Sequence, residues 1–279
     1  MNIRKFINGS LAALTLVFSV AFGGGQAHAQ SAQIPWNGGN LPSIEDPVFN
    51  IYTGMPYGNG NEADFVRLRE SNGDPTVTAT ASPFRDPVSV SCEDGDMFDV
   101  RTYMHNGADD DLNDNGDGSA VAHDVNVTMH APLNSEDDRF VFTSTINASN
   151  AQSISDTGTL NCGDEFTLTL VPNTVRIYSQ PYGWRNLPDS AVGHEDITSS
   201  TPVGSPEFGS GDFWGCWQYV TVIVYTVEVN EIPEDDDDDD DRRPRTIVET
   251  GPGDVAGIFA ATTLAGALAH RYVTSRRRR

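Results

Sequence analysis

Residues 217–229 read WQYVTVIVYTVEV, which is the strongest strand signal in the chain. Tyr219, Ile223, Tyr225, Val227 and Val229 share one face of such a strand, and Val220, Val222 and Val224 share the other. A strand that is apolar on both faces is typical of the middle of a sheet that is covered on both sides. The run therefore predicts a central strand beginning at Trp217, whose indole we expect to be buried.

Shorter alternating runs recur through the preceding part of the chain. They lie at residues 64–68, 76–80, 88–91, 97–105, 121–131, 140–146, 166–171 and 174–178. Period-two alternation, broken by turn residues roughly every 8 to 12 positions, predicts an all-β fold. We expect an immunoglobulin-like antiparallel β-sandwich over residues 47–231. The alternative is a split near residues 83–87, with a small N-terminal hairpin unit.

Two of these runs assign their residues clearly to opposite faces of a strand. In residues 97–105, one face carries Phe98, Val100, Thr102 and Met104, and the other carries Asp99, Arg101, Tyr103 and His105. In residues 121–131, the odd-numbered positions form the mainly apolar face. Because successive side chains of a strand point in opposite directions, the apolar faces are expected to line the core.

The N-terminus has the layout of a secretory signal peptide. Arg4 and Lys5 form a basic region, residues 11–22 are apolar, and an A-x-A site ends at Ala29. This order predicts cleavage between Ala29 and Gln30, so that residues 1–29 are removed. An extended N-terminal segment, residues 30–46, rich in Gly, Pro and Asn, then leads into the β-domain.

The C-terminus reads as a stalk and an anchor. Residues 232–254 begin with a run of eight acidic residues, 234–241, which repel one another and predict an extended linker. Residues 255–269 carry no charge, and the span reaches residue 273 if His270 and Arg271 extend towards the headgroups. The basic residues 274–279 would then form a cytoplasmic tail. A buried helix of a soluble domain is the alternative, which these flanks disfavour.

The segment before the anchor, Ile247-Val248-Glu249-Thr250-Gly251, resembles the LPXTG sorting signal of Gram-positive surface proteins. In that family a pentapeptide, an apolar span and a basic tail follow one another, as here. The resemblance implies that a sortase cleaves between Thr250 and Gly251 and joins Thr250 to the cell wall. Ile247 and Val248 stand where the family has Leu and Pro, and anchoring in the membrane alone would need no cleavage.

A second resemblance concerns the β-domain. Residues 100–132, VRTYMHNGADDDLNDNGDGSAVAHDVNVTMHAP, resemble the conserved-repeat, immunoglobulin-like domains of bacterial surface proteins. The similarity extends over roughly residues 88–229. It implies a displayed β module of envelope or adhesin-like proteins, without an activity of its own.

Charge and cysteine content narrow the class of protein further. The formal net charge is −23 at pH 7, and the only lysine is Lys5. Such an acidic surface argues against nucleic acid as a partner, and it suits divalent cations or a salty medium.

An exported chain meets an oxidising environment, so one disulfide is expected among Cys92, Cys162 and Cys216. We favour Cys92–Cys162, because each precedes an acidic, Gly-containing turn between two strands; no cysteine has a partner at metal-ligand spacing.

The loop at Asp111-x-Asn113-x-Asn115-Gly116-Asp117 matches the first half of a calcium-binding loop. Oxygen ligands at alternate positions around a glycine turn suit a hard cation. Position twelve is Ala122, so a nearby aspartate, from Asp109, Asp110 or Asp124, would have to replace the usual glutamate. The alternative is a solvated polar loop between two strands.

Two other groups of side chains are candidates for binding. His105, His123 and His130 flank the acidic loop, but His123 and His130 point to opposite faces, so ordinary strand residues are favoured over a zinc site. Trp184, Trp214 and Trp217, with Tyr178 and Tyr182, gather late in the chain. Exposed aromatic rings would suit stacking on sugars, although packing in the core and loops is the more common role.

The pattern as a whole predicts a cell-surface protein with a structural or adhesive role. No catalytic signature such as G-x-S-x-G or H-E-x-x-H occurs, so we expect no enzymatic activity. The membrane, through the C-terminal helix, a sortase with the cell wall, and an unknown extracellular ligand are the expected partners. A carbohydrate-binding module using the late aromatics is the first alternative, and a surface hydrolase is the second.

Overall fold

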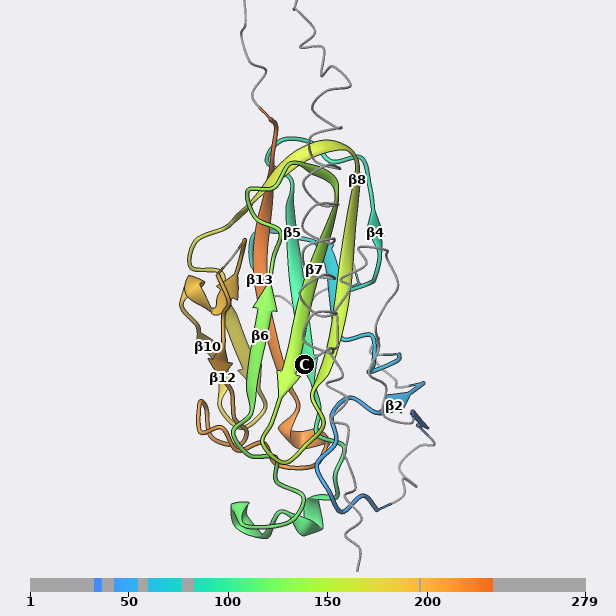
Figure 1. Cartoon of the computed structure of the whole chain (residues 1–279), viewed down its shortest axis with the longest axis vertical. Coiled ribbons are helices and arrows are strands. Elements are labelled where there is room, and N and C mark those ends of the chain that lie inside the picture. Colours follow the sequence, from blue (N-terminus) through green and yellow to red (C-terminus); the bar gives the residue numbers. More distant parts are fainter. Residues whose placement is uncertain (1–32, 37–42, 55–59, 77–82, 196, 233–279) are drawn as a thin grey trace, which may run out of the picture. The chain divides into compact units, whose positions relative to one another are not determined.

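The computed structural model describes residues 33–36, 43–54, 60–76, 83–195 and 197–232 (Figure 1). These residues form an all-β unit in which helix is limited to short 3-10 turns. The all-β prediction is therefore confirmed. No helix among the described residues is both long and apolar enough to cross a membrane.

The strands differ widely in length. The longer ones are β3 (Val66–Glu70), β5 (Met97–Met104), β6 (Asn126–His130), β7 (Asp137–Asn147), β8 (Ile154–Leu170), β9 (Arg176–Ser179), β10 (Gly183–Asn186) and β13 (Thr221–Asn230). The two-residue strands are β1 (Ile34–Pro35), β2 (Tyr52–Thr53), β4 (Val88–Ser89), β11 (Val192–Gly193) and β12 (Thr201–Pro202). The 3-10 turns are η1 (Asp110–Leu112), η2 (Asp114–Gly116), η3 (Asp189–Ala191) and η4 (Trp217–Tyr219).

Strand β13 is the centre of the large sheet. It pairs antiparallel with β5 along most of its length, with β9 through its first half and with β8 through its last residues. Its side chains are mostly buried on both faces, including Tyr225 and Val227. The predicted central strand is confirmed, but it starts at Thr221, because residues 217–219 form the η4 turn.

The large sheet has two layers that β8 joins. One layer has the strand order β3-β5-β13-β9-β10, and the other has β4-β8-β7-β6, with β11 and β12 both pairing with β6. The first part of β8 pairs with β7, and residues Thr167–Leu170 pair with β13. Gly163 lies between these parts at a φ of 92°, and β7 has a register shift between Asp137 and Arg139. The turn expected after Cys162 is therefore wrong: the chain bends there but continues as one strand.

The two layers face each other across a hydrophobic core. A hydrogen bond of 2.7 Å joins the hydroxyls of Thr102 on β5 and Ser144 on β7. A Cβ at Gly158 of β8 would lie 2.8 Å from Leu68 of β3, so glycine allows these strands to approach closely. Each large apolar side chain buried here contributes about 1.5–3 kcal/mol. The apolar faces of β5 and β6 therefore stabilise the fold, because they are buried between the two layers.

Several predicted strand limits differ from the structure. The run at residues 121–131 pairs as a regular strand only from Asn126, because Asp124 has a φ of 53°. The run at residues 88–91 shortens to two residues, and residues 77–80 of another run lie outside the described residues. Three short pairs, β1–β2, β4–β8 and β11–β6, are parallel, so the sheet is mixed rather than purely antiparallel. The first part of β8 and the β10 strand were not predicted.

Candidate functional site

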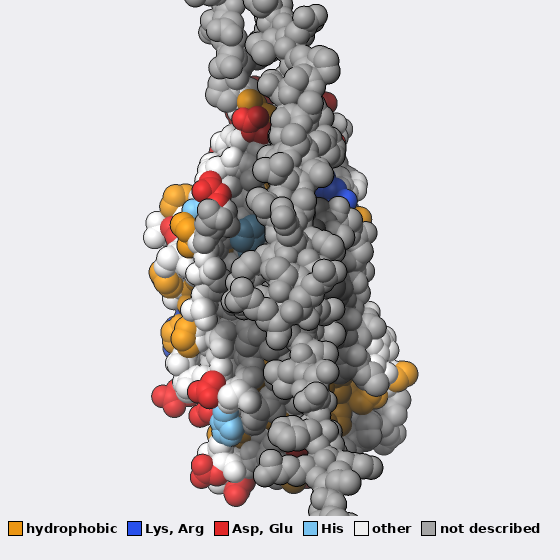
Figure 2. Space-filling view, viewed as in Figure 1, with side chains coloured by type: hydrophobic (Ala, Val, Ile, Leu, Met, Phe, Trp, Pro, Cys, Tyr) orange, Lys and Arg blue, Asp and Glu red, His pale blue; other side chains and the backbone are white. Residues whose placement is uncertain are grey.

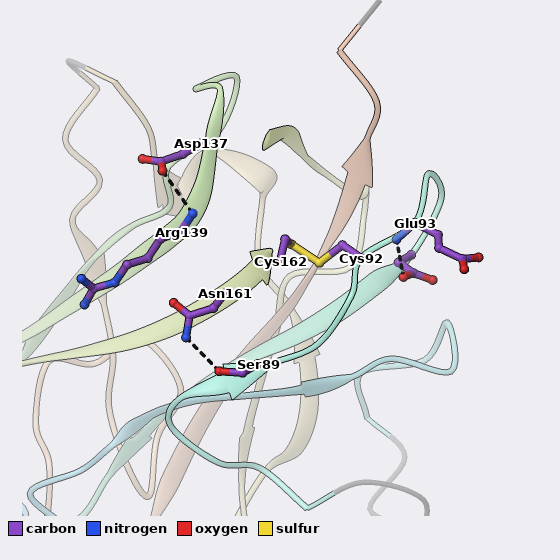
Figure 3. Close-up of a disulfide and its surroundings, with 8 residues drawn as sticks. Ser89, Cys92, Glu93, Asp137, Arg139, Asn161 and Cys162 are labelled. Carbon is purple, nitrogen blue, oxygen red and sulfur yellow. Dashed lines mark hydrogen bonds between the residues drawn. A yellow bond between two sulfur atoms is a disulfide. The ribbon is translucent and has the colours of Figure 1, made fainter. Parts of the chain in front are cut away.

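The predicted disulfide between Cys92 and Cys162 is confirmed (Figure 3). The Cα atoms are 4.9 Å apart, and the two residues are 70 positions apart in sequence. Main-chain pairing brings the cysteines together, since the N–H of Cys92 donates to the carbonyl of Cys162 at 3.3 Å. The Asn161 amide also donates to the Ser89 hydroxyl at 2.9 Å. The bond therefore fastens the chain after β4 to the middle of β8.

Cys216 is the thiol left over by this pairing. It is partly exposed and has a φ of 106°, which directs the chain into η4. Burial raises the pKa of its thiol. A thiol whose pKa is raised is mostly protonated at neutral pH and is a poor nucleophile.

The acidic loop, residues 109–117, consists of the two turns η1 and η2. The Asp109 carboxylate caps the first turn by accepting the N–H of Asp111 at 3.1 Å. Asn113 is buried and joins the main chain of Gly215 in both directions: its amide donates to the Gly215 carbonyl at 2.9 Å and accepts the Gly215 N–H at 2.8 Å. The conformation of the loop thus depends on Asn113.

The other predicted calcium ligands lie on the outer side of the acidic loop. Asp111, Asn115 and Asp117 are exposed, and Asn115 has a φ of 55°. No group of three His, Cys, Asp or Glu side chains within the described ranges has the arrangement of a metal site. Asn and main-chain oxygens are also calcium ligands. Calcium at Asp111, Asn113, Asn115 and Asp117 therefore stays a prediction.

The three histidines occupy separate environments. His123 is half-exposed, and its Nδ1 lies 2.8 Å from the Asp212 carboxylate. His130 ends β6, where it pairs with Thr143 of β7. His105 is 2% exposed, and its Nδ1 lies 2.8 Å from a carboxylate oxygen of Glu62. Each ring thus has its own surroundings.

Glu62 is the centre of a buried polar network. It is 1% exposed, and one carboxylate oxygen accepts the Tyr103 hydroxyl at 3.0 Å as well as contacting His105. The other oxygen accepts the N–H of Tyr52 at 3.0 Å. Asn50 completes the network by accepting the N–H of His105 and donating to the carbonyl of Tyr103. Because a buried carboxylate is costly unless it is hydrogen-bonded, this network binds Asn50, Tyr52 and Glu62 firmly to the end of β5.

The polar face of β5 is buried as well, because other segments cover it. Asp99 is fully buried between Arg69, whose Nε lies 2.9 Å away, and the Thr226 hydroxyl, which donates at 2.9 Å. The guanidinium groups of Arg69 and Arg101 lie over the Phe84 ring at 4.5 and 4.8 Å. The sequence pattern predicted the two faces of β5 but not that both are covered.

The late aromatic residues form separate pairs. Tyr178 on β9 and Trp184 on β10 contact each other at 5.1 Å between centroids, with their planes tilted by 49°, and Tyr182 contacts Phe208 at 5.6 Å. Trp214 contacts Tyr219 at 5.3 Å. Trp217 is 38% exposed, so the prediction that it is buried is wrong. The reason is the η4 turn, which places it before the strand rather than within it.

Trp217 belongs to a cluster of four rings that the sequence did not indicate. The four-ring cluster consists of Trp36, Tyr52, His105 and Trp217, and each ring contacts two of the others. The centroid distances are 6.0 Å for Trp36–Tyr52, 5.5 Å for Tyr52–His105, 5.4 Å for His105–Trp217 and 6.1 Å for Trp217–Trp36. Figure 2 shows hydrophobic side chains at the surface near β1 and β2, at the lower right. The contributing segments lie far apart in sequence, so no local pattern could join them.

The remaining predicted sites lie outside the described residues. These are the signal-peptide cleavage site at Ala29 and Gln30, the sorting-like site at Thr250 and Gly251, the span at residues 255–273 and the basic tail. They stay predictions. Comparisons with protein-family models, with curated proteins and with solved structures found no match.

Proposed function

We propose that the chain is an exported protein, anchored at the cell surface, whose β-domain has a structural or adhesive role without catalysis. The single observation that carries this proposal is the Cys92–Cys162 disulfide. Stable disulfides are rare in cytosolic proteins and common in exported ones. The disulfide thus agrees with the signal-peptide pattern of residues 1–29 and with the acidic linker and apolar span near the other end.

We further infer that the domain is an immunoglobulin-like sandwich, displayed on the linker of residues 232–254. Two facing layers and a central strand covered on both sides support this inference. The transmembrane span at residues 255–273, and sortase cleavage at Thr250, rest on the sequence pattern alone.

The proposal is tested on intact cells that produce the full chain. External protease should release peptides from residues 33–232, while a cytosolic marker remains intact. Mass spectrometry of the chain should find Gln30 as its first residue, and a chain recovered from the cytosol with Met1 in place would refute the proposal. A cell-wall-linked form ending at Thr250 would support sorting, and a chain in the cell-wall fraction that retains Arg279 would exclude it.

A second candidate function is sugar binding at the outer face of β9 and β10. Tyr178 and Trp184 are paired neighbours there, both partly exposed, with Arg176 two residues from Tyr178 on the same face. Flat, partly exposed rings suit stacking on a pyranose. A glycan array with the full chain, compared with Trp184→Ala, tests this function. Binding that is absent for every sugar, or unchanged in the variant, would remove it.

A further inference from the structure

We propose that the four-ring cluster is a binding site for a quaternary ammonium group, such as that of choline. This inference goes beyond the display function and names a ligand class for the unknown extracellular partner. The occupant is a trimethylammonium cation held against the exposed faces of Trp36 and Trp217.

The rings present aromatic surface at the edge of the domain. Trp217 is 38% exposed and Trp36 is partly exposed, whereas Tyr52 and His105 are buried beneath them. The planes of Trp36 and Trp217 are tilted by 40°, so the two indole faces are not stacked flat on each other. A cation within about 6 Å of ring centroids is attracted by the negative faces of the rings, and Trp is the strongest partner.

The charge around the cluster favours a cation. Glu62 lies beneath it, and Asp109 is held beside it through a 2.7 Å hydrogen bond from Ser43 and a main-chain bond to Ile44. Burial raises the pKa of Tyr52 to about 12, with smaller contributions from the nearby Glu62, Cys216 and Asp109. The net charge of −23 adds a long-range attraction for cations. Arg101 overlies the Tyr103 ring at 5.9 Å, and that ring is not among the four rings of the cluster.

The hydrogen bonds that Glu62 already accepts favour a quaternary ammonium ion over a primary one. Both carboxylate oxygens of Glu62 already accept bonds, from His105 and Tyr103 on one side and from Tyr52 on the other. A primary ammonium would have to compete with these bonds for the Glu62 oxygens, and no group with metal-site geometry occurs among the described residues. A quaternary ammonium has no N–H to satisfy and needs only aromatic faces and a negative field.

The test uses the full chain and two ligands of the same shape. Choline is titrated by calorimetry and by tryptophan fluorescence, in parallel with its uncharged analogue 3,3-dimethylbutan-1-ol. We expect choline to bind at least about tenfold more tightly than the analogue. Equal affinity for the two ligands, or no binding of choline, would overturn the proposal, and this comparison does not depend on any variant folding.

Variants locate the site. Trp217→Ala should weaken choline binding at least about tenfold, while Phe208→Ala, which removes a similarly exposed ring in contact with Tyr182, should leave it unchanged. Choline binding that survives Trp217→Ala in full would overturn the proposal. Vesicles identify the source of the cation. If the chain is retained on phosphatidylcholine vesicles but not on phosphatidylglycerol vesicles, and Trp217→Ala abolishes this retention, the ligand is a lipid headgroup. Binding of free choline without that retention indicates a soluble ligand.

Discussion

Removal of the disulfide should destabilise the domain by about 4 kcal/mol. The perturbation is the double variant Cys92→Ser/Cys162→Ser, which leaves neither a bond nor a free thiol at these positions. The two cysteines are 70 positions apart. In the chain-entropy model, closing a loop of this length removes about 15 cal/mol/K from the unfolded state, which is about 4.4 kcal/mol at 25 °C.

The folded state should survive this change. Hydrogen bonds from Val90 to Asn161 and from Cys92 to Cys162, together with the β4–β8 pairing, hold the same segments in place without the sulfurs. The cost therefore lies mainly in the unfolded chain, and the native contacts should remain.

The assay is urea and thermal denaturation of the full chain, followed by circular dichroism. For a domain of this size, about 4 kcal/mol corresponds to a fall in Tm of about 8–16 °C. The control is Cys216→Ser, which removes a cysteine outside the bond and should change the free energy of unfolding by less than about 0.5 kcal/mol. A loss below about 1 kcal/mol in the double variant would refute the reasoning.

Four further predictions follow from single features of the fold. Asp156 has a pKa raised to about 6 by burial, against the opposing effect of main-chain N–H bonds, so the folded state binds its proton more tightly than the unfolded state. The free energy of unfolding should therefore fall as pH rises from about 4 to about 6, by up to about 3 kcal/mol, and Asp156→Asn should flatten this slope in pH-dependent urea titrations. Gly158→Ala should cost about 1–3 kcal/mol in urea denaturation, because the new methyl group would meet Leu68; an unchanged midpoint would contradict the close approach of β3 and β8. Asn113→Leu should cost about 2–4 kcal/mol in the same assay, since it leaves the N–H and carbonyl of Gly215 without partners, and a neutral result would show that water replaces them. Calcium at about 100 times its Kd should stabilise the chain by about 2.7 kcal/mol, and a melting midpoint that chelator does not move would exclude calcium from the acidic loop.

The parts of the fold that alternation encodes could be predicted from the sequence. The doubly apolar run that ends at Val229 identified the central strand. The decisive information there lies within a few residues of each position, because a local pattern reflects the local environment. The Cys92–Cys162 bond was also predicted correctly, but the turn expected after Cys162 is not present, and the pairing of β4 with β8 is what brings the two cysteines together.

The rest depended on contacts between distant segments. Gly163 and the acidic residues after it indicated a turn, but the sheet continues through them because β8 belongs to both layers. The short β10 strand contains Gly183 and Asn186, which are typical of turns. The four-ring cluster joins Trp36 to Trp217, and nothing near either residue indicates the other. The buried Glu62 network likewise depends on contacts of Asn50, Tyr52 and Glu62 with the end of β5, which lies more than 40 positions away in sequence.

The placement of β13 determines how the domain would respond to a mechanical load. Tension applied through the residues after Asn230 enters the domain at the end of β13, and where it is directed along this strand it would shear the ladders with β5, β8 and β9 together. Ladders loaded in shear break many hydrogen bonds at once, whereas a strand peeled from an edge breaks them one by one. The 70-residue loop closed by the disulfide would stay unextended even after the strands separated. The strand that organises the fold is thus also the one best placed to carry force.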